Sequence, residues 1–488
     1  MTLQPSSTDP IAWIEAIATD DPNRLWLETP NGETISYVML NQAVTSMASR
    51  LAGAGVKSGD RVAAKLEKSP EAIILYFACL WVGAIYMPLN TGYTAVEIDY
   101  FLDDAEPVMF VGEDGDERRT HSLASLAALP AAVVGERPHF APDTVAAMVY
   151  TSGTTGRPKG AMLTRANLAS NAVALMNAWA ITKADILIHA LPIFHIHGLF
   201  IAINSITAAG AAMLFRAKFD PADVIALMPR ATMLMGVPTF YTRLLDHTAL
   251  TREATHPIRL FISGSAPLLA ETHRAFEART GHAILERYGM TETGINTSNP
   301  YDGARVAGTV GPPLPGVQVR VSDQSEGIGM IEVRGPNVFA GYWRNPEKTA
   351  AEFRDGGWFI TGDLGKIDAD GYVQIIGRGK DLIITGGYNV YPKEVEDEID
   401  ALPGVTESAV VGVPHADFGE AVIAVIVGEG LNPEAMLALL RTRLAAYKLP
   451  KAIHIVDELP RNAMGKVQKS VLRQTYLPVQ SPGESDTL

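Results

Sequence analysis

A segment rich in glycine and hydroxyl groups is the clearest chemical signal in the sequence. Residues 150–160 hold three glycines, four Ser or Thr hydroxyls and one lysine, directly after the apolar run 146–150. Glycines let the backbone turn sharply and bring its N–H groups close to an anion, while hydroxyls and an ammonium add donors and positive charge. We therefore predict a phosphate-binding loop, with an ordinary surface turn as the alternative. The residues expected to contact phosphate are Thr151, Ser152, Gly153, Thr154, Thr155 and Lys159.

This loop is not a Walker A motif, because no Gly-Lys pair in it is followed by Ser or Thr. Together with later segments it resembles the adenylate-forming superfamily of acyl-CoA synthetases, luciferases and nonribosomal-peptide adenylation domains. Members activate a carboxylic acid with ATP as an acyl-adenylate and release pyrophosphate, and most then pass the acyl group to a thiol. The later segments stand in the family's order: 288–293 (YGMTET), 361–363 (TGD), 377–381 (GRGKD) and 460–466 (PRNAMGK).

Glu292 lies among Gly, Met and Thr residues. Mg²⁺ prefers one or two carboxylates together with phosphate oxygens and water. From the residues alone, a helix-capping glutamate is an equal alternative. The resemblance implies instead that Glu292 and Thr151 hold Mg²⁺ beside ATP.

Asp363 and Arg378 resemble the ribose-binding pair of the family. A carboxylate can accept hydrogen bonds from two neighbouring hydroxyls, and a guanidinium supplies donors in a fixed fork; either residue could otherwise be a solvated turn residue. The adenine is expected to stack on a tyrosine and to meet backbone groups of the segment 265–267. The implied nucleotide contacts are Ser265, Ala266, Pro267, Glu286, Arg287, Tyr288, Gly289, Met290 and Thr291.

Lys466 follows Gly465 in a segment that Pro460 opens. In the family, the corresponding lysine contacts the acyl carboxylate and the α-phosphate and stabilises the charge that develops there. Without the motif it would be one exposed lysine among 40 Lys and Arg residues. The resemblance also implies that regulatory enzymes can acylate this lysine. The catalytic residues that it implies are Lys466, His195, Thr291 and Glu292.

The family rotates its small domain about a hinge between the two half-reactions, and the resemblance places this hinge at Lys380. The rotation is expected to bring a glycine-containing loop to the site, where pantetheine can pass close to the backbone. The implied CoA-binding residues are Gly386, Gly387 and Tyr388.

His195 and His197 are two residues apart, so both would face one side of an extended segment. A zinc site would need a further ligand, and none of suitable spacing stands nearby. The resemblance places His195 beside the reacting carboxylate and His197, with Ser265, in the acyl pocket.

Arg243 is the residue that we expect to select the acid. It belongs to a helix predicted after the strand 231–237, on the face that Phe240 shares. A guanidinium in a pocket pairs bidentately with a carboxylate, so Arg243 predicts a diacid. Arg259 is the second candidate, and a surface position is the alternative for both arginines.

The acid itself is suggested by a closer resemblance to malonyl-CoA synthetases over 235–238, 259–267 and 286–293. Malonate is the implied substrate, and methylmalonate stays open because a methyl group changes discrimination by only about 1 to 3 kcal/mol. A medium-chain or aryl acyl-CoA synthetase is the alternative within the superfamily. A noncatalytic phosphate-binding module would not need Lys466, and a hydrolase lacks support because the chain has no GxSxG motif.

Apolar runs rich in β-branched residues alternate with helical patterns, which predicts an α/β protein with parallel or mixed sheets. The predicted strands are 145–150, 231–237, 260–262, 317–321 and 330–333. Later in the chain, strands at 409–413 and 422–427 and helices at 391–401 and 433–446 predict a small α+β domain. The resemblance narrows this to a large multi-sheet N-terminal α/β domain, 1–379, and a small mobile C-terminal α+β domain, 380–488.

Composition agrees with an enzyme that acts on small molecules. A chain of 488 residues exceeds one hydrophobic core, and a net charge of -14 argues against a nucleic-acid partner. Cys79 is the only cysteine and is expected in the core. Residues 1–21 lack a secretory signal, and Gly83 and Pro88 interrupt the uncharged stretch 72–89, so we expect a cytoplasmic protein with no membrane partner. The expected ligands are ATP, Mg²⁺, coenzyme A and malonate or a similar diacid.

Overall fold

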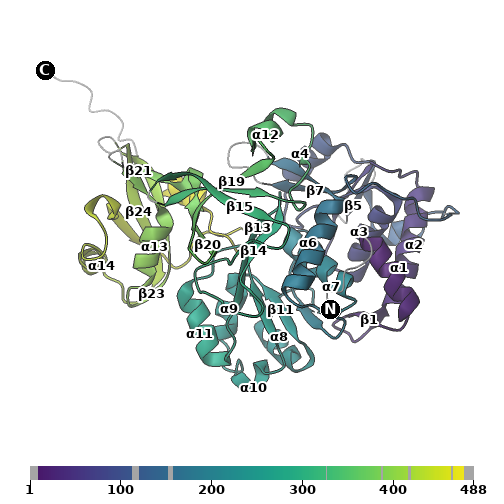
Figure 1. Ribbon diagram of the computed structural model, residues 1–488, viewed down its shortest axis with the longest axis horizontal. Coiled ribbons are helices and arrows are strands. Elements are labelled where there is room, and N and C mark those ends of the chain that lie inside the picture. Colours follow the sequence, from purple (N-terminus) through teal and green to yellow (C-terminus); the bar gives the residue numbers. More distant parts are fainter. Residues whose placement is uncertain are drawn as a thin grey trace. The chain divides into compact units, whose positions relative to one another are not determined.

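The computed structural model describes residues 9–112, 120–133, 135–151, 158–325, 327–385, 388–415, 419–462 and 465–477. The chain forms two compact units. The first comprises Met1–Arg320, Glu332–Ile360 and Asp368–Val373, and the second comprises Val321–Ile331, Thr361–Ile367 and Gln374–Leu488. Helices and strands alternate along the chain (Figure 1), which confirms the predicted α/β class. The predicted boundary between residues 379 and 380 stays a prediction.

An eight-stranded sheet belongs to the first unit. From β13 to β1 each neighbouring pair is parallel, whereas the outer strands β14 and β2 pair antiparallel. The inner strands are short and apolar, as strands buried on both faces are. In spatial order they are β14 (Gly294–Ser298), β13 (Leu285–Met290), β12 (Leu260–Ser263), β11 (Met233–Gly236), β9 (Ile186–His189), β10 (Ala212–Phe215), β1 (Leu25–Glu28) and β2 (Thr34–Ser36).

A seven-stranded sheet also belongs to the first unit. It is parallel from β7 to β6, and β8 and β17 extend it antiparallel. The β7–β8 pairing sets Thr151 opposite Lys159, so the two ends of the predicted phosphate loop meet. In spatial order the strands are β17 (Gly341–Tyr342), β8 (Lys159–Thr164), β7 (Val145–Thr151), β4 (Ile85–Pro88), β3 (Arg61–Lys65), β5 (Met109–Gly112) and β6 (Thr120–His121).

Helices pack on these sheets, and most helices of the first unit begin at polar caps. Ser69, for example, accepts a hydrogen bond from the Ala72 amide, and Pro70 occupies the first turn, where a missing N–H costs nothing. The helices of the first unit are α1 (Pro10–Asp20), α2 (Tyr37–Gly53), α3 (Pro70–Val82), α4 (Ala95–Ala105), α5 (Leu123–Ala127), α6 (Arg165–Ala178), α7 (Asn204–Ala209), α8 (Pro221–Leu227), α9 (Pro238–Leu245), α10 (Arg252–Thr255), α11 (Ala270–Thr280) and α12 (Pro346–Ala351), with the π-helix η1 (His197–Ile203) and the 3₁₀ turn η2 (Met228–Arg230).

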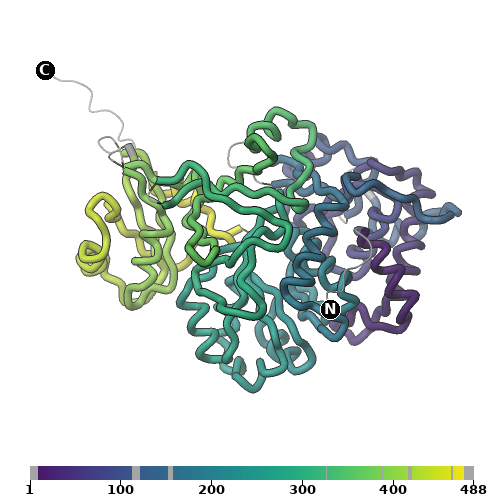
Figure 2. Tube along the Cα trace, in the orientation of Figure 1, coloured from purple at the N-terminus to yellow at the C-terminus, as the bar shows by residue number. Residues whose placement is uncertain are grey.

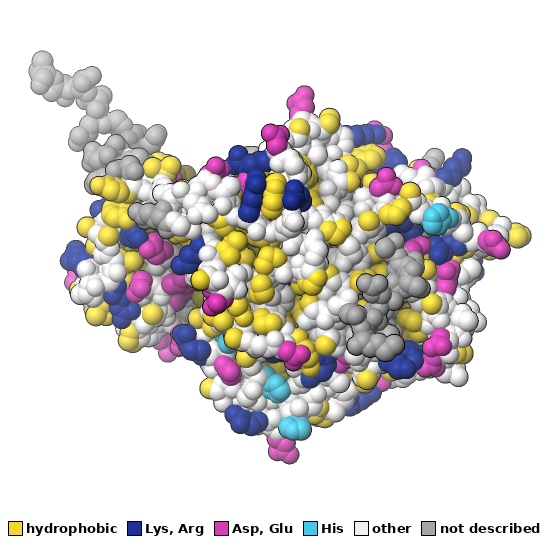
Figure 3. Space-filling view, in the orientation of Figure 1, with side chains coloured by type: hydrophobic (Ala, Val, Ile, Leu, Met, Phe, Trp, Pro, Cys, Tyr) yellow, Lys and Arg dark blue, Asp and Glu magenta, His cyan; other side chains and the backbone are white. Residues whose placement is uncertain are grey.

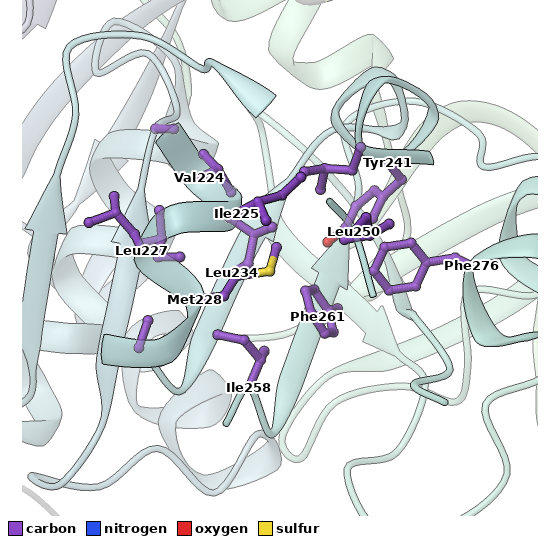
Figure 4. Close-up of a cluster of buried hydrophobic side chains, with 14 of the residues drawn as sticks. Val224, Ile225, Leu227, Met228, Leu234, Tyr241, Leu250, Ile258, Phe261 and Phe276 are labelled. Atoms are coloured by element: carbon purple, nitrogen blue, oxygen red, sulfur yellow. The ribbon is translucent and has the colours of Figure 1, made fainter. Parts of the chain in front are cut away.

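One hydrophobic cluster holds strands β11 and β12 in place, and the candidate active site lies at the carboxyl ends of these strands. Figure 4 shows side chains of β11 and β12 packed against those of α8, α9 and α11. The Phe276 ring meets Tyr241 edge to face at 5.3 Å and Phe261 at 4.9 Å between centroids. Such packing leaves these strands little freedom to shift.

Helix α6 lies beside β14, although they are far apart in sequence (Figure 2). The Asn171 amide donates to the Ile295 carbonyl at 2.8 Å, and the Ile295 N–H donates to the Asn171 side chain at 3.0 Å. The strand that follows Glu292 is therefore held by side-chain hydrogen bonds on its outer edge.

Another five strands are β15 (Gln318–Ser325), β16 (Ile328–Arg334), β19 (Trp358–Ile367) and β18 (Phe353–Arg354), with β20 (Val373–Arg378) beside β19. The second unit has its own sheet of β22 (Tyr388–Val390), β21 (Ile383–Thr385), β24 (Gly419–Gly428) and β23 (Val405–His415), with β25 (Ala452–Ile455) beside β24. Its helices are α13 (Pro392–Asp400), α14 (Pro433–Leu440) and α15 (Lys469–Thr475), with the 3₁₀ turns η3 (Gly379–Asp381) and η4 (Ala446–Lys448).

The predicted strands and helices are present, with shifted ends. The predicted helix 433–446 is too long, because α14 stops at Leu440 and a turn follows. The uncharged stretch 72–89 is buried as predicted, in α3 and β4, and Cys79 is fully buried there. Among the described residues, no helix is long and apolar enough to cross a membrane. On the face drawn in Figure 3, Lys and Arg side chains are scattered among Asp and Glu side chains.

Candidate active site

Chemistry-bearing residues of the first unit gather where parallel strands end. Strand β9 ends at His189, β11 at Gly236 and β12 at Ser263, and these strands are neighbours in one sheet. Carboxyl ends of parallel strands lie at one edge, where ligands bind in open α/β sheets. The acyl-pocket candidates follow these ends in the chain.

The predicted phosphate loop connects β7 to β8. Its ends, Thr151 and Lys159, are paired across the two strands, and Ser152, Gly153, Thr154 and Thr155 lie outside the described residues. The Lys159 ammonium stands 5.6 Å from the centre of the Tyr342 ring. Burial and the nearby Lys348 charge lower the pKa of Lys159. A cation held in this way favours an incoming anion.

Glu292 lies in the turn between β13 and β14, so it does not cap a helix. Glu292 is only 6% exposed. Its carboxylate accepts a 3.1 Å hydrogen bond from the Tyr342 hydroxyl, and its backbone carbonyl accepts one from the Phe339 N–H at 2.8 Å. Thr291 precedes it, half-buried. The tight turn needs Gly289, because a Cβ there would stand 1.9 Å from the Gly294 carbonyl oxygen.

A magnesium ion would bind at the Glu292 turn only together with a nucleotide, which supplies further oxygen ligands. Among the residues described, no group of three or more His, Cys, Asp or Glu side chains is arranged to hold a metal. One carboxylate at Glu292 and a hydroxyl at Thr151 are the hard oxygen donors that Mg²⁺ accepts, and it completes its octahedron with phosphate oxygens and water. The donor set therefore suits magnesium bound to a nucleotide.

The two histidines do not lie in an extended segment, so they do not share one side of a strand. His195 is in a turn, and its Nδ1 accepts a 3.2 Å hydrogen bond from the His197 N–H, which begins the π-helix η1. The His197 ring is 1% exposed, and its Nδ1 lies 3.1 Å from the Ser265 hydroxyl. Its Nε2 has no hydrogen-bond partner among the described groups. Burial and the Arg287 charge hold the pKa of His197 well below its ordinary value.

Ser265 stands in a strained backbone conformation. Its φ of 73° lies in the left-handed region, which residues other than glycine rarely adopt. Strain of this kind tends to occur at functional sites. Here it directs the hydroxyl toward His197, while Ala266 is half-buried and Pro267 is exposed.

Arg287 is the least expected residue of the site. Its side chain lies flat against Gly264, where a Cβ would stand 2.4 Å from the guanidinium carbon. The residue is 5% exposed, and its Nε and Nη2 have no hydrogen-bond partner among the described groups. Burial lowers the pKa of Arg287 to about 9, which leaves it charged near neutral pH. The sequence motif grouped it with the nucleotide contacts and gave no sign of this burial.

The two arginines predicted to select the acid, Arg243 and Arg259, differ in their surroundings, and their role as acid selectors stays a prediction. Arg243 is exposed on α9, and the neighbouring Phe240 stacks on Phe219 at 3.8 Å between ring centres. Arg259 makes hydrogen bonds of 2.7 and 2.8 Å to both oxygens of Asp185 and further bonds to main-chain carbonyls. These contacts give Arg259 a structural role at the opposite end of β12.

Other predicted nucleotide residues lie on β13. Glu286 is buried and its carboxylate stands 3.3 Å from His273 Nδ1. Tyr288, Gly289 and Met290 are half-buried, and the pairing of β13 with β14 shifts between Tyr288 and Gly289. Bulges of this kind commonly redirect side chains next to active sites.

The second unit holds the predicted ribose pair. Asp363 Oδ1 and Arg378 Nε form a 2.6 Å ion pair, and the Asp363 side chain is 4% exposed. The Asp363 N–H donates to the Thr361 hydroxyl at 3.0 Å, which holds the turn. An ion pair of this geometry keeps both groups oriented.

The catalytic-lysine candidate is exposed in the same unit. The Lys466 N–H donates to the Asn462 side chain at 3.0 Å, and the Asn462 N–H donates to the Lys466 carbonyl at 2.9 Å. Lys380, the predicted hinge, is exposed in η3. Gly386 and Gly387 lie outside the described residues, and Tyr388 is 59% exposed and stacks on Tyr447 at 4.7 Å.

Comparisons with known proteins identify the family of the chain. The model of the AMP-binding enzyme family matches residues 14–343, and the model of the AMP-binding enzyme C-terminal domain matches residues 394–466. The crystal structure of ATP-bound MatB from Rhodopseudomonas palustris is 54% identical, with a TM-score of 0.93, and the match covers 96% of this chain and 99% of that chain.

Curated relatives carry different acids in their names. A malonate–CoA ligase of Arabidopsis thaliana is 33% identical over 87% of this chain and 79% of its own length. A feruloyl-CoA synthase of Amycolatopsis sp is 36% identical over 91% of this chain and 94% of its own length. Both of these curated relatives are named as a CoA ligase or a CoA synthase. The chain therefore belongs to the AMP-binding enzyme family and is an adenylate-forming acid–thiol ligase whose cosubstrates are ATP, with Mg²⁺, and coenzyme A.

Proposed function

We propose that this ligase is a malonyl-CoA synthetase. Malonate and ATP give malonyl-adenylate and pyrophosphate, and the CoA thiol then displaces AMP to give malonyl-CoA. The proposal rests on one observation: the guanidinium of Arg287 is buried beside Gly264 and near His197, and its Nε and Nη2 have no hydrogen-bond partner among the described groups. A buried charge is costly unless it is paired, so this site favours an anionic ligand.

Among the residues that the structure describes, the neighbours of Arg287 carry no compensating charge. His197 is neutral, because burial disfavours its protonated form, and Ser265 and Ser263 contribute hydroxyls. The second carboxylate of malonate would accept hydrogen bonds from Arg287 and from His197 Nε2. Hydrogen bonds to charged groups contribute roughly 1.5 to 3 kcal/mol each.

A monocarboxylic acid would leave the guanidinium unpaired. Its only charge is consumed in the acyl-adenylate bond, so nothing remains to neutralise Arg287. The predicted selector Arg243 is exposed in this structure, and we propose it as an outer contact that meets the acid at the pocket entrance. Arg287 takes the central role in the proposal.

The nucleotide half of the reaction follows from the other contacts. Lys159 and the loop after Thr151 would hold the phosphates, and Glu292 with Thr151 would ligate Mg²⁺, which neutralises charge on the phosphate oxygens. Asp363 and Arg378 would hold the ribose. Lys466 would contact the reacting carboxylate and the α-phosphate, and its exposed amine makes it our proposed site for regulatory acylation.

Two relatives support different acids as the substrate. The malonate–CoA ligase of Arabidopsis thaliana supports malonate, whereas the feruloyl-CoA synthase of Amycolatopsis sp, similar at comparable identity, supports an aryl acid as the second candidate. Methylmalonate remains within the proposal, since both of its carboxylates have the same spacing as those of malonate.

The test is product analysis with a panel of acids. Purified enzyme with ATP, Mg²⁺ and CoA is given malonate, methylmalonate, butyrate or ferulate, and nucleotide and thioester products are identified by chromatography and mass spectrometry. We expect AMP, pyrophosphate and malonyl-CoA, with kcat/KM for malonate at least about a hundredfold above that for butyrate. Formation of ADP, or a preference for ferulate, would refute the proposal.

A further inference from the structure

Tyr342 connects two candidate ligands of the nucleotide phosphates. It forms β17 with Gly341, and Tyr342 pairs antiparallel with Ala161 of β8, two residues beyond Lys159. Its hydroxyl donates a 3.1 Å hydrogen bond to Glu292 Oε1, and its ring lies 5.6 Å from the Lys159 ammonium. One side chain therefore meets both the candidate magnesium carboxylate and the candidate phosphate lysine.

The tyrosine is itself held tightly. Tyr342 is 7% exposed, and its backbone N–H donates to the Thr349 hydroxyl of the neighbouring helix α12 at 2.9 Å. Gly341 precedes it with a φ of 123°, and a Cβ there would stand 2.7 Å from the Thr349 methyl carbon. Helix α12 can therefore approach only because residue 341 is glycine.

The backbone of the same segment holds the Glu292 turn. The Phe339 N–H donates to the Glu292 carbonyl at 2.8 Å, three residues before Tyr342. The 339–342 segment thus makes hydrogen bonds to both the backbone carbonyl and the side-chain carboxylate of Glu292. A hydrogen bond to one carboxylate oxygen fixes the rotation of the group, as partners of metal-ligating side chains commonly do.

We infer that Tyr342 is a positioning residue that orients the Glu292 carboxylate toward Mg²⁺ and keeps the Lys159 ammonium over its ring for the phosphates. The inference rests on the proposed roles of Glu292 and Lys159. It gives the hydroxyl and the ring separate tasks, the hydroxyl for the metal and the ring for the lysine. These tasks can be removed one at a time.

Equilibrium binding of a nonhydrolysable ATP analogue, measured by calorimetry with and without Mg²⁺, tests the inference on the full-length protein. For Tyr342→Phe we expect the Mg²⁺ concentration needed for half-maximal tightening to rise roughly tenfold. Binding without Mg²⁺ should change by less than about twofold, because the ring remains. Tyr342→Leu should weaken Mg²⁺-free binding as well, because Lys159 loses the ring face.

A matched control is Tyr372→Phe. Tyr372 also belongs to the first unit, and its hydroxyl donates to the Ala304 carbonyl at 2.9 Å. This variant should bind the analogue as the parent does. If Tyr342→Phe behaves like Tyr372→Phe, or weakens binding equally with and without Mg²⁺, Tyr342 does not orient the metal ligand.

Two further measurements separate the possible failures. Glu292→Gln should lose the Mg²⁺ dependence of binding; if it keeps that dependence, the metal role of Glu292 is wrong and the inference about Tyr342 falls with it. Thermal melting must show that Tyr342→Phe is folded, since a general loss of structure would lower binding in both conditions. No acid is present in these experiments, so their outcome is independent of whether malonate is the substrate.

Discussion

At the residue scale, we propose that the selectivity of the candidate acyl pocket depends on buried polar side chains that have no ionic partner among the described groups. His189 and His197 are each 1% exposed. Burial holds the pKa of both well below the ordinary value; the Lys68 charge adds to this for His189 and the Arg287 charge for His197. A ring that stays neutral can accept or donate a hydrogen bond without repelling Arg287.

This burial predicts a loss of stability in acid. In the unfolded chain these histidines bind a proton near pH 6.5, whereas the folded state resists it, so their contribution is present above about pH 6.5 and is lost as pH falls. Each buried histidine should cost up to about 1.4 kcal/mol per pH unit below that point. We expect His189→Gln to flatten the dependence by this amount when urea unfolding is compared at pH 7.5, 6 and 5.

The exposed His139 provides the control. His139→Gln should show the same pH dependence as the parent. An identical slope in the parent and His189→Gln would mean that His189 is protonated in the folded state.

At the element scale, the β13–β14 hairpin determines where Glu292 stands. Adding a methyl group at Gly289 would bring a carbon within 1.9 Å of the Gly294 carbonyl oxygen, so the hairpin would have to open. Gly289→Ala should therefore lower the free energy of unfolding by more than about 2 kcal/mol and strongly reduce adenylate formation. Chemical denaturation and pyrophosphate release measure the two effects.

Gly135→Ala is the matched control, because a Cβ there would meet nothing within 4 Å. It should leave stability within about 0.5 kcal/mol of the parent. If Gly289→Ala is equally harmless, the hairpin adapts and does not fix Glu292.

Helices and strands could be predicted from the sequence where the local hydrophobic pattern agrees with the burial in the structure. The apolar run 145–150 is strand β7, and the uncharged stretch 72–89 is the buried pair of α3 and β4. Helix 433–446 was overestimated: α14 ends at Leu440, and the Thr442 hydroxyl donates to the Leu439 carbonyl at 2.7 Å. Such side-chain hydrogen bonds to the backbone compete with continuation of a helix.

The site was readable only in part. Motifs singled out Thr151, Glu292 and Lys466 as candidates, whereas the burial of Arg287 depends on Gly264, which follows strand β12. The hydrogen bond from Tyr342 to Glu292 joins residues 50 positions apart. No local pattern can encode contacts of this kind, because they arise when distant strands are brought together.

At the scale of the whole molecule, the two half-reactions are expected to use the second unit differently. We predict that Lys466→Ala reduces malonyl-adenylate formation at least about a hundredfold, while attack of CoA on supplied malonyl-adenylate is spared. Lys380→Pro should give the reverse pattern, because proline fixes φ at the hinge. Single-turnover kinetics of each half-reaction provide the readout, and equal losses in both half-reactions for either variant would contradict a rotating unit.

The central claim is that Arg287 selects a diacid, and the ratio of kcat/KM for malonate to that for butyrate tests it most directly. We expect the parent to favour malonate, and Arg287→Met to lose about 2 to 5 kcal/mol of transition-state stabilisation with malonate but little with butyrate. Arg259→Met should keep the ratio and lose stability, on the order of 3 kcal/mol, because Asp185 would remain buried without its partner. If Arg287→Met kept the parent's preference within a few fold, or if the parent preferred butyrate, the account would be wrong.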